Sequence, residues 1–149
     1  MSRADRRTGS WPAVVGAVVA ALLTLPVSGC GDSAPRGDRE EVAQLIRDYY
    51  SALADGNAES VCSKLAGEQQ RRVIRNVSAL DPSAITCRTA VRVSNGVMGP
   101  DDVSRLRNVK ISRVRIDGRT AAVEVKGGLR PVVLTKTQDN GWLISGGIQ

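Results

Sequence analysis

Residues 38–57 have the sequence DREEVAQLIRDYYSALADGN, and this stretch decides the expected fold. Asp38, followed three positions later by Glu41, matches a capping box at the start of a helix. Residues 55–57, Asp-Gly-Asn, are turn formers that end it. Between them, apolar residues recur at helical spacing and form one face that can pack on a core. That face consists of Val42, Leu45, Ile46, Tyr49, Tyr50 and Leu53.

The next part of the chain predicts three shorter helices. Asn57 can cap a helix that continues to about Leu65, and residues 68–77 carry a second apolar stripe. A third helix from Ser83 to about Ala90 follows a proline, which favours a helix start, and it would turn Ile85 inward. Residues 94–102, SNGVMGPDD, are rich in turn formers and predict a loop.

The C-terminal part changes to the alternation that is typical of strands. Residues 109–116 predict a strand whose phase breaks near Ser112, as it does at a β-bulge. The pair Asp117-Gly118 predicts a hairpin turn, and residues 120–126 and 129–136 predict two more strands. Pro131 lacks a backbone donor and marks the third strand as an edge or a bulged strand. Trp142 faces the core from a last strand.

Helices followed by an antiparallel meander predict an α+β fold. We expect a single domain, residues 38–149, with the N-terminal helices packed on a curved sheet of about four strands. Its size suits one modest hydrophobic core.

The element order resembles the nuclear transport factor 2-like (SnoaL-like, cystatin-like) fold. The resemblance covers about residues 38–148 and includes the Asp-Gly-Asn after the first helix, the Asp-Gly-Arg-Thr-Ala of residues 117–121 and the Gly-Trp of residues 141–142. It implies a cone-shaped domain that can enclose a pocket, and another helix-plus-sheet topology is the alternative. Tyr49, Tyr50 and Trp142 are candidates to line the pocket, or else they pack in the core.

The first thirty residues predict export and a lipid anchor. Three arginines precede the uncharged stretch 11–25, which is shorter than the roughly 20 residues of a membrane-spanning helix. Residues 27–30, Val-Ser-Gly-Cys, resemble the bacterial lipobox. That resemblance implies a signal peptide over residues 1–29, cleavage between Gly29 and Cys30, diacylglyceryl transfer to Cys30 and a flexible tether over residues 30–37. An uncleaved anchor and an ordinary signal peptide are the alternatives.

Two cysteines remain in the predicted domain, Cys62 and Cys87. An even number in an exported domain favours a disulfide. Buried free thiols or a metal pair are the alternatives, and the absence of histidine and of a Cys-x-x-Cys motif disfavours a metal. We therefore predict a disulfide, no metal ligand and no cofactor.

The composition argues against several functions. The net charge is +6, but the basic residues are dispersed, and aromatic residues make up only 3% of the chain, which leaves few platforms for stacking nucleic-acid bases. Without histidine, acid–base catalysis would need a strongly shifted group, such as Asp48, Asp81 or Glu124 buried in a pocket.

From these features we expect a lipid-anchored protein on the extracytoplasmic face of the cell membrane. We predict that its domain is a non-catalytic module without a catalytic residue, and that it binds a small apolar ligand or a protein of the cell envelope. A small enzyme of the SnoaL-like type and an accessory subunit of a membrane complex are the alternatives. The sequence does not indicate an oligomeric state.

Overall fold

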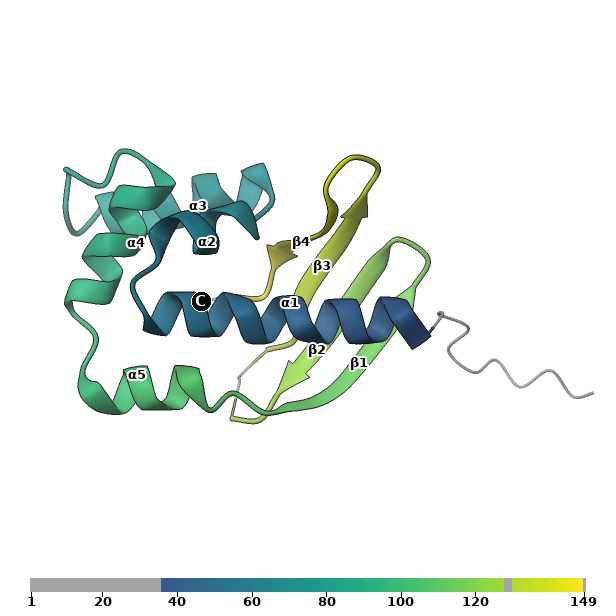
Figure 1. Cartoon of the computed structure of the whole chain (residues 1–149). Coiled ribbons are helices and arrows are strands. Elements are labelled where there is room, and N and C mark those ends of the chain that lie inside the picture. Colours follow the sequence, from purple (N-terminus) through teal and green to yellow (C-terminus); the bar gives the residue numbers. More distant parts are fainter. Residues whose placement is uncertain (1–35, 128–129, 149) are drawn as a thin grey trace, which may run out of the picture.

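A computed structural model describes residues 36–127 and 130–148 of the chain (Figure 1). The predicted signal peptide, the Gly29–Cys30 cleavage site, the lipidation site and tether residues 30–35 lie outside these residues. The described residues form five helices and then four strands, which is the expected α+β architecture. In chain order the elements are α1 (Arg36–Ala54), α2 (Ala58–Ser63), α3 (Gly67–Ser78), α4 (Cys87–Gly96), α5 (Pro100–Arg107), β1 (Ile111–Asp117), β2 (Thr120–Val125), β3 (Val132–Thr137) and β4 (Gly141–Gly146).

The strands form one antiparallel sheet in the order β1-β2-β3-β4. The register shifts between Ile111 and Arg113, which confirms the bulge predicted near Ser112. Gly118 has a φ of 55° in the turn between β1 and β2, a conformation that glycine adopts without strain. Pro131 precedes β3, so the prediction of a proline within that strand is wrong, and β3 pairs with a strand on each side.

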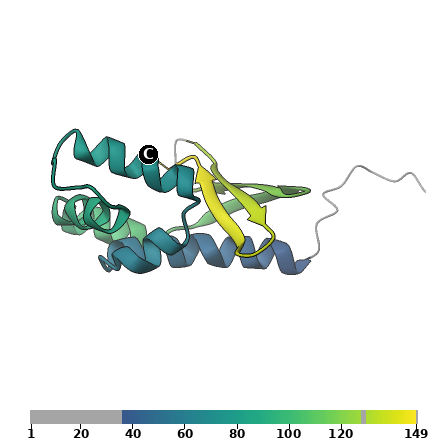
Figure 2. The ribbon, with the colours of Figure 1, turned by 90° about the horizontal axis from the view of Figure 1, so that it is seen from above.

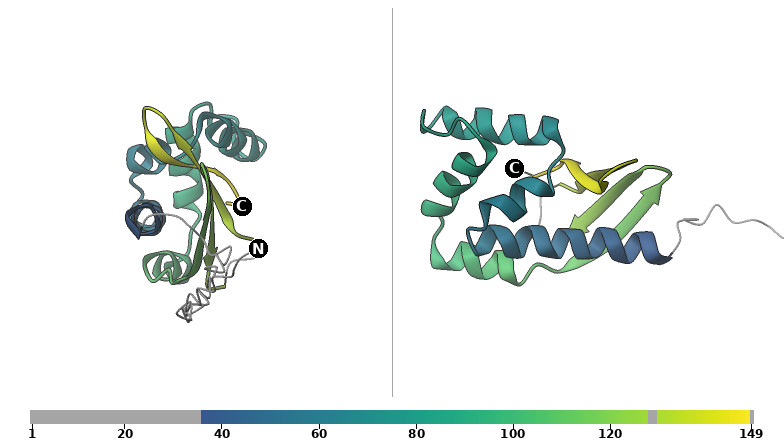
Figure 3. Two further views of the ribbon diagram at one scale, coloured as in Figure 1. Left: turned by 90° about the vertical axis from the view of Figure 1, so that its right-hand side faces the viewer. Right: turned by 45° about the horizontal axis from the view of Figure 1, so that its top comes forward.

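The core lies between α1 and one face of the curved sheet, and Figure 3 shows α1 beside the strands. Val42 and Ile46 of α1 and Val123, Leu134 and Ile144 of the sheet have no exposed surface. Each such aliphatic side chain contributes about 1.5–3 kcal/mol on burial. Buried side chains therefore fill the space between α1 and this face of the sheet.

The start of α1 differs from the predicted capping box. The helix begins at Arg36, so Asp38 lies in its first turn, and residues 36–37 of the predicted tether are helical. The Asp38 carboxylate lies 2.8 Å from Nζ of Lys136 on β3. This ion pair with the sheet uses the carboxylate that the prediction assigned to the helix cap.

Several predictions for the region between α3 and β1 are wrong. The helix predicted from Ser83 begins only at Cys87, because Thr86 and Thr89 form the capping box there. Ile85 precedes that cap and is 75% exposed, so its predicted inward position is wrong. The predicted loop 94–102 instead contains the end of α4 and the start of α5. Pro100 at the first position of α5 favours that start.

The helices surround one half of the molecule. Figure 2 shows α3 and α1 on opposite sides of the helical half, with α4 at the far end from the sheet. The chain after β4 leads back toward this half as far as Ile148 (Figure 3). Among the described helices, none combines the length and the apolar character that crossing a membrane requires.

Candidate functional site

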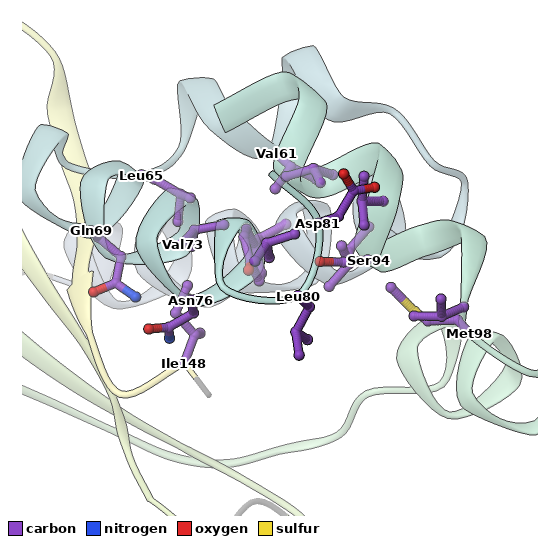
Figure 4. Close-up of a pocket in the computed structure, with 16 residues that line it drawn as sticks. Val61, Leu65, Gln69, Val73, Asn76, Leu80, Asp81, Ser94, Met98 and Ile148 are labelled. Atoms are coloured by element: carbon purple, nitrogen blue, oxygen red, sulfur yellow. The ribbon is translucent and has the colours of Figure 1, made fainter. Parts of the chain in front are cut away.

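A cavity of about 600 Å³ lies within the helical half of the molecule (Figure 4). Its walls come from the second half of α1, α2, α3 and α4, and Ile148 borders it after β4. Most side chains on the walls are apolar, and the polar ones are few. The polar residues that border the cavity are Tyr49, Gln69, Asn76, Asp81 and Ser94.

Helical spacing explains how α3 forms one wall. Gln69, Val73 and Val77 follow one another at intervals of four residues, so they lie along one face of the helix. This face borders the cavity, where Val73 and Val77 are only half-buried, and Val73 also packs against the edge of the main core.

A disulfide joins two of the walls. Cys62 of α2 is bonded to Cys87 at the start of α4, with their Cα atoms 6.1 Å apart. The predicted pair is therefore present in the structure. Val61, next to Cys62, and Val91, one helical turn after Cys87, border the cavity.

Gln69 is the unusual residue of the cavity wall. It is 2% exposed, and among residues 36–127 and 130–148 it is the one buried residue that is neither apolar nor aromatic. Its Oε1 atom has no hydrogen-bond partner among those residues. Leaving such a buried acceptor unsatisfied costs about 1–3 kcal/mol, and an orphaned group of this kind calls for an explanation beyond stability.

Exposed apolar side chains stand at the mouth of the cavity. Leu80, which follows α3, is 87% exposed, and Val97, which follows α4, is 82% exposed. Both border the cavity, together with Met98. Ile85 is 75% exposed in the same part of the molecule but does not border it.

The two titratable groups on the wall have pKa values that move away from neutrality. Burial raises the pKa of the Tyr49 hydroxyl above its ordinary value, and the neighbouring Tyr50 adds to this shift. Hydrogen bonds from Ser83 hold the pKa of the Asp81 carboxyl below its ordinary value. At neutral pH, Tyr49 is therefore protonated and Asp81 is ionised.

The predicted pocket residues separate in the structure. Tyr49 is buried and borders the cavity, whereas Tyr50 does not border it and meets the Tyr49 ring edge-on, at 5.2 Å between ring centroids. Trp142 is 2% exposed in the core on β4 and does not border the cavity either. It borders a separate shallow groove, and Nζ of Lys136 lies 5.5 Å from its ring.

The other acids that catalysis would require do not lie in the cavity. Asp48 is exposed on α1 and accepts a hydrogen bond from Gln44, and Glu124 of β2 pairs with Arg115 at 3.4 Å. Across the described ranges, no three acidic or cysteine side chains come together as metal ligands would.

Comparison with protein-family models, with curated proteins and with solved structures gives no match for this chain. The resemblance to the nuclear transport factor 2-like fold thus stays a prediction.

The sequence did not predict the residues at the cavity mouth, nor that Gln69 is buried with an unsatisfied oxygen. The mouth residues Val97 and Met98 lie in the predicted loop 94–102, and Leu80 lies between two predicted helices. The apolar stripe of α3 was the one available signal, because it predicts that Val73 and Val77 face inward.

Proposed function

We propose that this protein is a lipid-anchored lipoprotein of the extracytoplasmic membrane face whose domain binds a small apolar molecule in the cavity of the helical half. The observation that carries the proposal is the cavity itself, which is mostly apolar and bordered by Gln69, whose Oε1 atom has no hydrogen-bond partner among the described residues. Ligand sites are typically concave, apolar and furnished with a few polar groups.

The dimensions of the site favour a small molecule over a protein partner. A cavity of about 600 Å³ falls within the range of roughly 300–1,000 Å³ that small-molecule sites occupy. A standard protein interface uses roughly 20–30 residues on each side. Among the described residues, the large apolar side chains that stand exposed are Leu80, Ile85 and Val97.

The chemistry of the walls favours binding without catalysis. Proton transfer at neutral pH is most efficient for a group whose pKa lies near 7. The pKa of Tyr49 is raised from an ordinary value that is already alkaline, and the pKa of Asp81 is lowered from one that is already acidic. Neither group is suited to exchange a proton during turnover.

Binding of the uncharged fluorescent probe N-phenyl-1-naphthylamine tests the proposed cavity site. We expect the native protein to bind it saturably and the Leu80→Arg variant to bind it more weakly, because the arginine replaces an apolar contact at the mouth. Loss of one such contact is worth about 1–2 kcal/mol, so Kd should rise about fivefold to thirtyfold.

Ile85→Arg is the matched control, because Ile85 is also exposed and apolar but lies outside the cavity. It should leave Kd within about twofold of the native value. Equal weakening by both substitutions, or no saturable binding by the native protein, would show that the cavity is not the site.

A further inference from the structure

A second surface feature lies along α1, closer to its N-terminal end than the cavity. A groove runs between the first half of α1 and the edge strand β1. Four arginines border it, and one acid, Glu40, stands among them. We call it the basic groove, and its arginines are Arg36, Arg39, Arg47 and Arg113.

Two of these arginines have charges that no residue in the described part of the chain neutralises. Arg47 pairs with Glu40 at 3.2 Å, and this accounts for the one acid in the groove. Arg36 and Arg113 are exposed and make no ion pair with any described residue. Arg113 lies on β1 directly after the bulge, where the pairing register with β2 shifts. The groove therefore presents a net positive charge to an outside partner.

The position of the groove along the chain indicates which partner it meets. Arg36 is the first residue of α1, and Cys30 lies only a few residues before it. Even a fully extended chain between those two residues spans at most about 20 Å. If Cys30 carries the lipid, the first turn of α1 is held close to the headgroups of that bilayer.

We propose that the basic groove docks on the anionic phospholipid headgroups of the membrane that holds the anchor. This inference rests on the anchored location in the proposed function. Its two grounds are the unpaired charges of Arg36 and Arg113 and the short reach from Cys30. Basic residues at an anionic membrane surface strengthen binding by about fivefold each, over a range set by the Debye length.

Docking by the groove also orients the cavity. The connection between α3 and α4, which carries Leu80, lies at the opposite end of the molecule from the start of α1 (Figure 1). With the groove on the headgroups, the mouth of the cavity faces away from the anchored end.

The test measures how close each end of the lipidated full chain lies to the bilayer. A fluorophore is placed on Ser112→Cys in the groove or on Ser83→Cys in the α3–α4 connection, both at exposed positions. The protein is reconstituted into vesicles that contain a phosphatidylcholine with a nitroxide-labelled headgroup as quencher. One set of vesicles also contains phosphatidylglycerol, and the other has only phosphatidylcholine.

In the anionic vesicles we expect strong quenching at residue 112 and weak quenching at residue 83. In the neutral vesicles the quenching at these two positions should differ little. The double variant Arg36→Gln, Arg113→Gln should lower the docked-to-undocked ratio by about 25-fold, at about fivefold per arginine. The matched control is Arg71→Gln, Arg75→Gln on α3, which removes the same charge from exposed positions outside the groove.

Equal quenching at the two positions in anionic vesicles would overturn the docking proposal, as would equal effects of the two double variants. Flotation of the protein with neutral vesicles measures the anchor separately. A chain that fails to float with them lacks the anchor and contradicts the proposed location, whereas a chain that floats without groove-specific quenching contradicts docking alone.

Discussion

Two neighbouring glutamines on α3 have opposite effects on the stability of the folded protein. Gln69 is buried with an unsatisfied oxygen on the cavity wall. Gln70 donates from Nε2 to the backbone oxygens of Cys62 and Leu65, at 2.9 and 3.1 Å. Gln70 thus stabilises the segment that follows α2, whereas Gln69 carries a cost. Residues that cost stability where they stand are typical of functional sites.

Replacement of Gln69 by leucine should raise the free energy of unfolding by about 1–3 kcal/mol, because it removes the unsatisfied buried acceptor. Urea unfolding of the purified domain, followed by circular dichroism, measures the change. Gln70→Leu is the control with the opposite sign and should lower stability by about 1–2 kcal/mol. A destabilised Gln69→Leu variant would mean that the Gln69 amide is satisfied in solution.

At the scale of elements, the disulfide between α2 and α4 holds two walls of the cavity together. It closes a loop with a sequence separation of 25. On the chain-entropy model, a disulfide that closes such a loop raises the free energy of unfolding by about 3 kcal/mol. Because both cysteines belong to the core cluster, the bond also fixes where α4 packs.

The double variant Cys62→Ser, Cys87→Ser should therefore unfold with a free energy that is lower by about 2–5 kcal/mol. Thermal or urea unfolding under non-reducing conditions provides the comparison. Dithiothreitol should lower the stability of the native protein and leave that of the double variant unchanged. If the reductant has no effect on the native protein, the two thiols are not bonded in it.

The elements that the sequence predicts best are those with local signals. The apolar face of α1, the Asn57 cap, which accepts a hydrogen bond from the Ser60 backbone N–H, and the hairpin at Gly118 all depend on neighbouring residues. The α4 boundary was missed because Thr86 and Thr89 compete with Pro82 as a helix start, and α5 because Gly99 and Pro100 can begin a helix as well as form a turn.

The cavity could not be predicted in the same way. It exists because of the way α3 packs on α4 and β4, and this depends on contacts between distant parts of the chain. The resemblance to a cone-shaped fold implied a pocket but did not indicate where it lies, and the space between α1 and the sheet is filled by side chains such as Ile46 and Trp142.

At the scale of the whole molecule, α1 separates two surfaces of different chemistry. The basic groove borders its first half, and the apolar cavity borders its second half. The helix has 19 residues and is therefore about 28 Å long. The end proposed to be anchored and the end proposed to bind a ligand are thus distinct parts of one small domain.

The proposed acylation of Cys30 is the step on which the proposed membrane location and the proposed orientation of the cavity both depend. Two acyl chains hold a protein stably at a membrane, whereas one chain holds it only reversibly.

The most direct measurement is the intact mass and the membrane partitioning of the native protein and of Cys30→Ala, both expressed in a bacterium and labelled with a fatty-acid analogue. We expect the native protein to begin at Cys30, to carry the label and to sediment with membranes, and Cys30→Ala to carry no label and to leave the membrane fraction. A Cys30→Ala variant that keeps both the label and its membrane partitioning would contradict the lipid anchor.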